Sequence, residues 1–97
     1  MATEQLLNIL KLDLQLMTTA YDQLLLWLID EAICQIEGEG ITLDLDCSRD
    51  IGLVRMYAAW LYRARGLTDP AQTAMPRMLR FALNNRKVRE VVDRADP

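Results

Sequence analysis

LVRMYAAWLYRARG, residues Leu53 to Gly66, decides the fold, because its apolar residues do not keep to one side of a helix. On a helical wheel, a first apolar side consists of Ile51, Val54, Tyr57, Ala58 and Leu61. Leu53, Met56 and Trp60 form a second side, nearly opposite the first. A helix that is apolar almost all round needs cover on both sides. Either this chain or a second subunit must supply that cover.

Three further helices surround this one in our interpretation. Thr3 caps a first, short helix that ends at Asp13 and takes its apolar side from Leu6, Leu7, Ile9 and Leu10. Thr19 and Asp22 resemble a capping box at the start of a second helix. Glycine readily takes the left-handed cap conformation, so Gly38 and Gly40 end that helix. Its predicted core stripe is Tyr21, Leu25, Leu28, Ile29, Ala32 and Ile36.

The remaining chain completes a single helical domain over residues 1–97. ITLDLD, Ile41 to Asp46, alternates apolar and polar residues and predicts a short extended connection. The helix that contains LVRMYAAWLYRARG begins near Ser48 and stops at Gly66. After a loop from Leu67 to Pro76, a basic fourth helix begins with Pro76 in its first turn. We predict an all-α fold, a small bundle of four helices, ordered over about residues 3–90 and frayed beyond. The apolar residues of the fourth helix are Met78, Leu79, Phe81, Ala82 and Leu83. We assign Phe81 to the core.

The residue types present argue against catalysis. The chain of 97 residues has no histidine to act as a general base at neutral pH, and no phosphate-binding or nucleophile-elbow motif. Cys34 and Cys47 lack the spacing of a zinc site, and Asp44 with Asp46 lacks a third acid. We therefore predict no enzyme activity, no cofactor and no metal site. The longest large-apolar run, Leu24 to Ile29, is too short to cross a bilayer, and we expect an intracellular protein without a signal peptide.

The net charge of −3 is unevenly distributed. Residues 1–50 carry ten acidic and two basic side chains, whereas residues 51–97 carry nine basic and four acidic ones. Such asymmetry is typical of a protein with an anionic partner, or of one half attracting the other half of an identical neighbour. It is equally compatible with neutralisation of the two halves inside one fold.

Surplus apolar residues favour a subunit interface. Interfaces are enriched in Trp, Met and Arg, and the candidates are Leu26, Trp27, Leu53, Met56 and Trp60. The alternative is that a loop or the first helix covers these side chains. Candidates for charge pairing between subunits, or for contact with a partner, are Arg55, Arg63, Arg65, Arg77, Arg80 and Arg86.

A second hypothesis assigns the basic fourth helix to nucleic acid. Neutralising phosphates needs Lys and Arg on one face, and this helix offers Arg77, Arg80, Arg86, Lys87 and Arg89. Asn84 and Asn85 could read adenine edges. The acidic N-terminal half would repel a phosphate backbone, so this small helical regulator is the alternative.

Three segments carry a family resemblance. EGITLD at Glu39 to Asp44, LVRMYAAWLYRAR at Leu53 to Arg65 and MPRMLRFALNNR at Met75 to Arg86 resemble the head-to-tail connector proteins of tailed phages and prophages. The resemblance runs from about Leu6 to Arg86. The segment MTTAYDQLL, residues 17–25, departs from the aspartate-rich entry to the second helix that is typical of the family.

The resemblance implies a structural role in the virion. These small helical adaptors form a homo-oligomeric ring, twelve-fold to follow the portal, that extends the DNA channel at the head–tail junction. The implied partners are the portal protein and a tail-proximal stopper or tail protein, while DNA passes through without sequence-specific binding. The implied locations are the virion and, during assembly, the cytoplasm of the bacterial host. The family carries no catalytic residue or cofactor to this chain.

Overall fold

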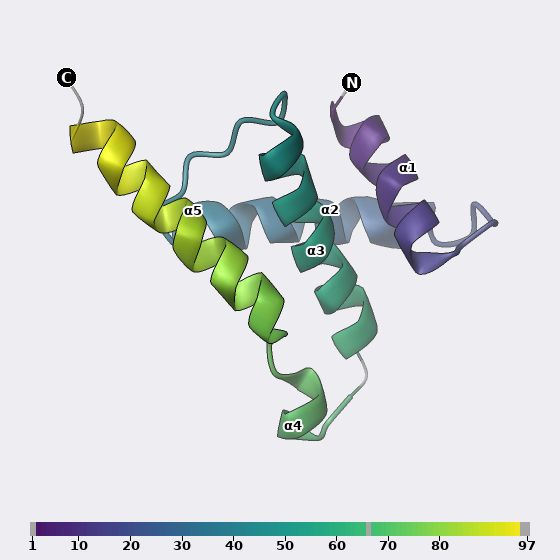
Figure 1. Ribbon diagram of the computed structural model, residues 1–97. Helices are drawn as coiled ribbons and strands as arrows, with labels where there is room; N and C mark the ends of the chain where they lie inside the picture. The colour runs from purple at the N-terminus through teal and green to yellow at the C-terminus, as the bar shows by residue number, and fades with distance from the viewer. Residues whose placement is uncertain (1, 66, 96–97) are drawn as a thin grey trace.

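The computed structural model describes residues 2–65 and 67–95 of the chain. Its helices are α1 (Ala2–Leu14), α2 (Asp22–Gly38), α3 (Ser48–Ala64), α4 (Pro70–Thr73) and α5 (Arg77–Ala95). The predicted all-α fold with four principal helices is confirmed (Figure 1). The single-turn helix α4 lies within the predicted loop. Asp69 caps it by accepting the Ala71 N–H at 3.0 Å, and Pro70 supplies a first residue that needs no hydrogen-bond acceptor.

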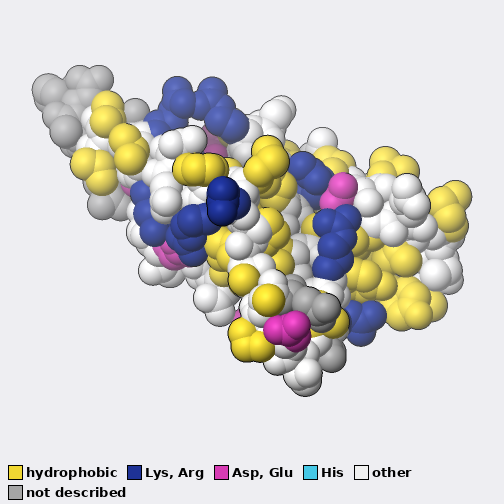
Figure 2. Space-filling model, turned by 60° about the horizontal axis from the view of Figure 1, so that its bottom comes forward, with side chains coloured by type: hydrophobic (Ala, Val, Ile, Leu, Met, Phe, Trp, Pro, Cys, Tyr) yellow, Lys and Arg dark blue, Asp and Glu magenta, His cyan; other side chains and the backbone are white. Residues whose placement is uncertain are grey.

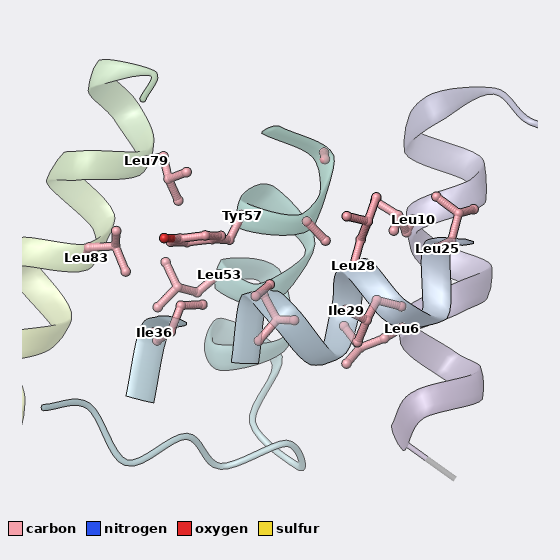
Figure 3. Packing of buried hydrophobic residues seen from close by; sticks show 14 of the residues in the cluster. Leu6, Leu10, Leu25, Leu28, Ile29, Ile36, Leu53, Tyr57, Leu79 and Leu83 are labelled. Carbon is pink, nitrogen blue, oxygen red and sulfur yellow. The ribbon is translucent and has the colours of Figure 1, made fainter. Parts of the chain in front are cut away.

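Helix α3 is the central element, because it packs against α1, α2 and α5 (Figure 1). Val54, Tyr57 and Ala58 are buried, as predicted for its first apolar side. Leu53 is also buried, with 4% of its surface exposed. Figure 3 shows it with Tyr57 in the layer between α3 and the leucines of α5. Three neighbouring helices are enough to cover most of α3 within one chain.

The buried stripe of α2 matches the periodicity of its sequence. Leu25, Leu28, Ile29, Ala32 and Ile36 are all buried, whereas Tyr21 is exposed. The prediction for Tyr21 was wrong because this residue is the N-cap of α2 and precedes its first full turn. The predicted capping box is also absent, since no side chain caps α2 and the Thr19 carbonyl accepts the Asp22 N–H.

The chain leaves α2 at the predicted glycines. Helix α2 ends at Gly38, and Gly40 has a φ of +96°, in the region that favours glycine. Ile41 then enters the core. Residues 41–44 have no regular secondary structure and residues 45–46 form a turn, whereas an extended connection was predicted over the whole segment. The Asp44 carboxylate accepts the Asp46 N–H at 3.0 Å, which forms a turn before α3.

Helices α1 and α5 cover opposite parts of the core. Leu6 and Leu10 of α1 are fully buried, one helical turn apart. On α5 the corresponding pair is Leu79 and Leu83, while Phe81 is exposed. The prediction of Phe81 in the core was wrong because two residues along a helix turn the side chain by about 200°. Only one side of α5 meets α3.

The ends of α5 differ slightly from the predicted ones. The Pro76 carbonyl accepts the Arg80 N–H at 3.1 Å, so Pro76 lies just before the helix instead of in its first turn. The segment predicted to fray after about residue 90 is helical as far as Ala95. The predicted stop of α3 at Gly66 falls outside the described residues, and the helix ends at Ala64. Across residues 2–65 and 67–95, no helix is both long and apolar enough to cross a membrane.

Candidate assembly surfaces

The predicted second side of α3 is largely covered inside the chain. Leu53 is buried, which corrects its assignment to a subunit interface, and Met56 and Trp60 are half-buried. The Trp60 indole N–H donates to the Thr73 carbonyl at 3.2 Å. Its ring also meets the Tyr57 ring edge-on, with centroids 5.3 Å apart. For Trp60, the loop that contains α4 supplies the cover that the alternative hypothesis expected.

Trp27 and Leu26 on α2 remain accessible. Trp27 is 61% exposed, and Leu26 is half-buried beside it. Together with Gln23, Leu24 and Asp30 they line a shallow hollow of about 480 Å³ on the outer side of α2. We call these five residues the Trp27 patch. An exposed tryptophan at a hollow is the kind of anchor that interfaces use.

A second apolar surface, not predicted from the sequence, lies on the outer side of α5. Met78, Phe81, Val88 and Val92 are 75%, 59%, 63% and 59% exposed. Figure 2 shows hydrophobic and basic side chains mixed on the left of the molecule, where α5 runs toward its C-terminus. The spacing of three and four residues between apolar positions was present in the sequence. It was missed because this helix has two apolar sides, and periodicity does not say which side faces inward.

A groove of about 470 Å³ separates α3 from α5. Leu53, Met56 and Ala82 form its apolar part, and Arg49, Arg86 and Arg89 are among its polar lining. Met56, one of the predicted interface residues, is therefore accessible from this groove. The groove adjoins the exposed side of α5 through Asn85 and Arg89.

Most arginines predicted to contact partners already have contacts within the chain. Arg55 and Arg63 reach Asp13 at 3.3 and 3.8 Å, and the Arg65 guanidinium lies 4.6 Å from the centroid of the Tyr62 ring. Arg80 and Lys87 both bind Glu39, at 3.1 and 2.6 Å. Arg77 is exposed and has no ion pair among the described residues. The structure thus assigns these side chains mainly to the protomer itself.

Arg86 forms the most enclosed of these contacts. Its Nε donates to Asp50 Oδ1 at 3.0 Å, and its Nη2 donates to the Thr42 carbonyl at 2.7 Å. Nη1 reaches Glu90 Oε2 at 3.3 Å. The prediction of Arg86 as a partner contact is corrected, because only 15% of its side chain is exposed. The residue joins α3, α5 and the 41–47 connection.

The electrostatics of this cluster follow from its hydrogen bonds. The hydrogen bond that Arg86 donates to the Asp50 carboxylate raises the pKa of Arg86 and keeps the guanidinium charged. Hydrogen bonds with Thr42, and then the contact with Arg86, lower the pKa of Glu90. Burial alone would raise the pKa of Glu39, but hydrogen bonds from Lys87 and Arg80 outweigh it and lower that pKa.

The charge asymmetry between the two halves is partly cancelled inside the fold. Asp13, Glu39 and Asp50 of the acidic half all pair with arginines of the basic half. The charges that remain outside these pairs are local. On α2, Asp22 pairs with Lys11 at 2.9 Å, which leaves three acidic residues and no basic one on that helix. Arg77 and Arg89 are exposed along α5 without an ion pair among the described residues.

The polar residues considered for chemistry are spread over the surface. Cys34 is exposed, Cys47 is half-buried and both are free thiols. Asp44 and Asp46 share a turn, as their hydrogen bond shows. In the part of the chain that the structure describes, no group of three or more His, Cys, Asp or Glu residues could hold a metal ion.

Comparisons of the chain with protein-family models, with curated proteins and with solved structures gave no match.

Proposed function

We propose that this protein is a structural adaptor of a tailed phage or prophage, which assembles into a ring between the portal of the head and the tail. One observation carries the proposal: a protomer of 97 residues exposes apolar surfaces on two helices, and those surfaces lie among charges of opposite sign. The resemblance of its three sequence segments to head-to-tail connectors supplies the biological setting.

The physical argument concerns the position of the apolar side chains. Monomeric soluble proteins rarely expose large contiguous apolar patches, and such patches often mark interaction sites. Here the core is filled, with Leu6, Leu25 and Leu83 all fully buried, so the exposed residues are not needed to complete it. Phe81 and Trp27 also lie on different helices. Two unlike patches favour head-to-tail contacts, which close into a ring when the rotation between neighbours allows.

The nucleic-acid alternative has less support from the geometry. Arg80, Arg86 and Lys87 are neutralised by carboxylates of the same protomer. Arg77 and Arg89 are left as the members of that basic set without an ion pair among the described residues. Apolar side chains lie beside them, whereas phosphate binding needs several adjacent cations.

The test is to purify the chain and measure its mass by light scattering over a wide concentration range, alone and with a portal protein from the same phage or prophage. We expect ring-shaped oligomers, visible by electron microscopy, that bind the portal. A chain that stays monomeric at high concentration and does not bind the portal would contradict the proposal. Salt-dependent binding to duplex DNA by such a monomer would favour the alternative.

A further inference from the structure

The outer side of α5 has the spacing of a helix-pairing seam. Met78, Phe81, Asn85, Val88 and Val92 are all exposed and follow one another at intervals of three, four, three and four residues. This is the spacing with which one helix packs along another. We call these five residues the α5 seam. At 1.5 Å per residue it is about 21 Å long.

The seam points away from the protomer's own core. Leu79 and Leu83, which are buried, lie on the other side of the same helix. Arg86 and Lys87 also turn inward, toward Asp50 and Glu39. The contacts inside the protomer therefore leave the seam free along its whole length.

Charge decides which kind of helix suits the seam. Arg77 and Arg89 flank it, both exposed and without an ion pair among the described residues. Two copies of α5 packed on each other would bring these like charges together, which is unfavourable at the flanks of paired helices. An acidic helix with an apolar anchor would be complementary.

The outer side of α2 meets that description. Helix α2 carries four acidic residues and no basic one. Asp22 is paired with Lys11 of α1 at 2.9 Å, so Asp30, Glu31 and Glu37 are the acids that remain for a partner. Trp27 supplies an exposed aromatic anchor, next to the hollow of the Trp27 patch. Gln23 and Glu37, both exposed, are separated by the same number of residues as the two ends of the α5 seam. The two helices thus offer strips of similar length.

Within one protomer, the positions of α2 and α5 prevent the α5 seam from packing on the Trp27 patch. In Figure 1, α2 crosses behind α3, whereas α5 lies beside α3 and passes in front of the C-terminal end of α2. The α5 contacts with the α2 end of the molecule pass through Glu39, beyond the C-terminus of α2, and do not involve Trp27. The complementary strip must come from another molecule.

We propose that the α5 seam of one copy packs on the Trp27 patch of α2 in the next copy. The interface is heterologous, because each copy contributes a different strip to its two neighbours. Trp27 and Phe81 are its apolar anchors, and the acidic residues of α2 face Arg77 and Arg89. This inference rests on the self-assembly in the proposed function, and it specifies which surfaces meet.

The experiment uses two single variants that each destroy one strip, Trp27→Asp and Phe81→Asp. Both positions are exposed, so helicity and the unfolding midpoint should stay close to those of the wild type. Each variant alone should self-associate at least about 30-fold more weakly, as is typical after loss of an interface hot spot. Mixed together, they should form a one-to-one dimer, because Trp27→Asp keeps an intact seam and Phe81→Asp keeps an intact patch.

The mixture distinguishes this interface from its competitors. A seam that packs on another seam would be lost in Phe81→Asp, and Trp27→Asp alone would still dimerise. Failure of the mixture to form a dimer, while the wild type assembles, would overturn the inference and leave the proposed function standing. If the wild type assembles only on the portal, each variant is tested there alone, and binding of Trp27→Asp or Phe81→Asp to the portal at the wild-type level would overturn the inference.

Met17→Asp is the matched control. Met17 is 94% exposed, so the substitution introduces the same charge at an even more accessible apolar residue, in the loop between α1 and α2 and outside both strips. This variant should assemble like the wild type. If Met17→Asp disrupts assembly as strongly as Phe81→Asp, the effect arises from net charge, and the seam is not the interface.

Discussion

At the scale of single residues, Arg86 shows how a surface-type side chain becomes part of the fold. It binds Asp50, Glu90 and the Thr42 carbonyl at once. Asp50, whose side chain is only 5% exposed, also accepts the Asp44 N–H at 2.8 Å. A buried carboxylate of this kind depends on its counter-charge, since removing one partner leaves an uncompensated charge.

Arg86→Leu should lower the free energy of unfolding by about 3 kcal/mol, because it leaves Asp50 buried without a cation. Urea denaturation followed by circular dichroism measures this loss, at a concentration where the protein is monomeric. Arg77→Gln is the control, and it should change stability by less than about 0.5 kcal/mol, since Arg77 is exposed. Equal effects of the two substitutions would mean that the Arg86 contacts contribute nothing.

Glu39 gives the fold a dependence on acid pH. Its pKa is lowered below 4.5 by Lys87 and Arg80, so the folded state holds its proton more weakly than the unfolded chain does. The stabilisation is therefore present above the unfolded pKa and is lost as the pH falls through the folded pKa. Glu39→Gln should lower stability at pH 7 by about 0.5 to 1 kcal/mol, a value typical of accessible ion pairs.

The same variant should show a smaller further loss between pH 5 and pH 3 than the wild type does. Denaturation curves at both pH values provide the measurement. If wild type and variant lose stability in parallel on acidification, the Glu39 contacts are not the source of the dependence. Glu31→Gln is a suitable control on the same acidic helix, because Glu31 is not in any ion pair among the described residues.

At the scale of elements, the inner side of α5 packs in the core and its outer side is exposed. Leu79 and Leu83 complete the core against α3, and the α5 seam lies on the other side. The sequence of α5 is apolar on both sides, so the helix could have packed either way from its periodicity alone. The inward ion pairs of Arg80, Arg86 and Lys87 distinguish the two sides.

Leu83→Ala should cost about 3 kcal/mol of unfolding free energy, because it removes buried methyl groups and leaves a cavity. Val88→Ala, on the outer side of the same helix, should change the stability of the monomer by less than about 0.5 kcal/mol. Thermal or urea unfolding of both variants compares the sides directly. A larger loss for Val88→Ala would show that α5 packs on its other face.

At the scale of the whole molecule, the two halves of the chain neutralise each other only in part. Asp13, Glu39 and Asp50 bind basic residues of the second half, and these ion pairs cancel part of the charge asymmetry between the two halves. The outer sides of α2 and α5 keep their opposite charges. The protomer therefore has an acidic outer side on α2 and a basic outer side on α5, and each side exposes one aromatic residue, Trp27 or Phe81.

Self-association should weaken as salt is added, because charges on the two strips attract each other through water. We expect a loss of about tenfold in affinity between about 0.05 and 0.5 M NaCl, with apolar burial sustaining the remainder. Sedimentation or light scattering over a salt series measures it. Association that strengthens with salt would indicate an interface that is purely apolar and would contradict the role of Arg77 and Arg89.

Local sequence determined much of the fold. The apolar period of α2 correctly identified Leu25, Leu28, Ile29, Ala32 and Ile36 as core, and Gly38 and Gly40 correctly marked its end. Because α3 has two apolar sides, its sequence likewise predicted a central helix with neighbours on both sides. These predictions succeeded because period and cap chemistry depend on neighbours within a turn or two of the chain.

Only the tertiary structure decided which apolar sides are shared inside the protomer. It buried Leu53, exposed Phe81 and gave most of the candidate arginines partners within the chain. The physical reason is that periodicity defines the faces of a helix, whereas contacts between helices far apart in the sequence select the face that turns inward. The large apolar side chains that stay exposed therefore lie on α5, together with Trp27 on α2, whereas the helix of LVRMYAAWLYRARG is mostly covered within the protomer.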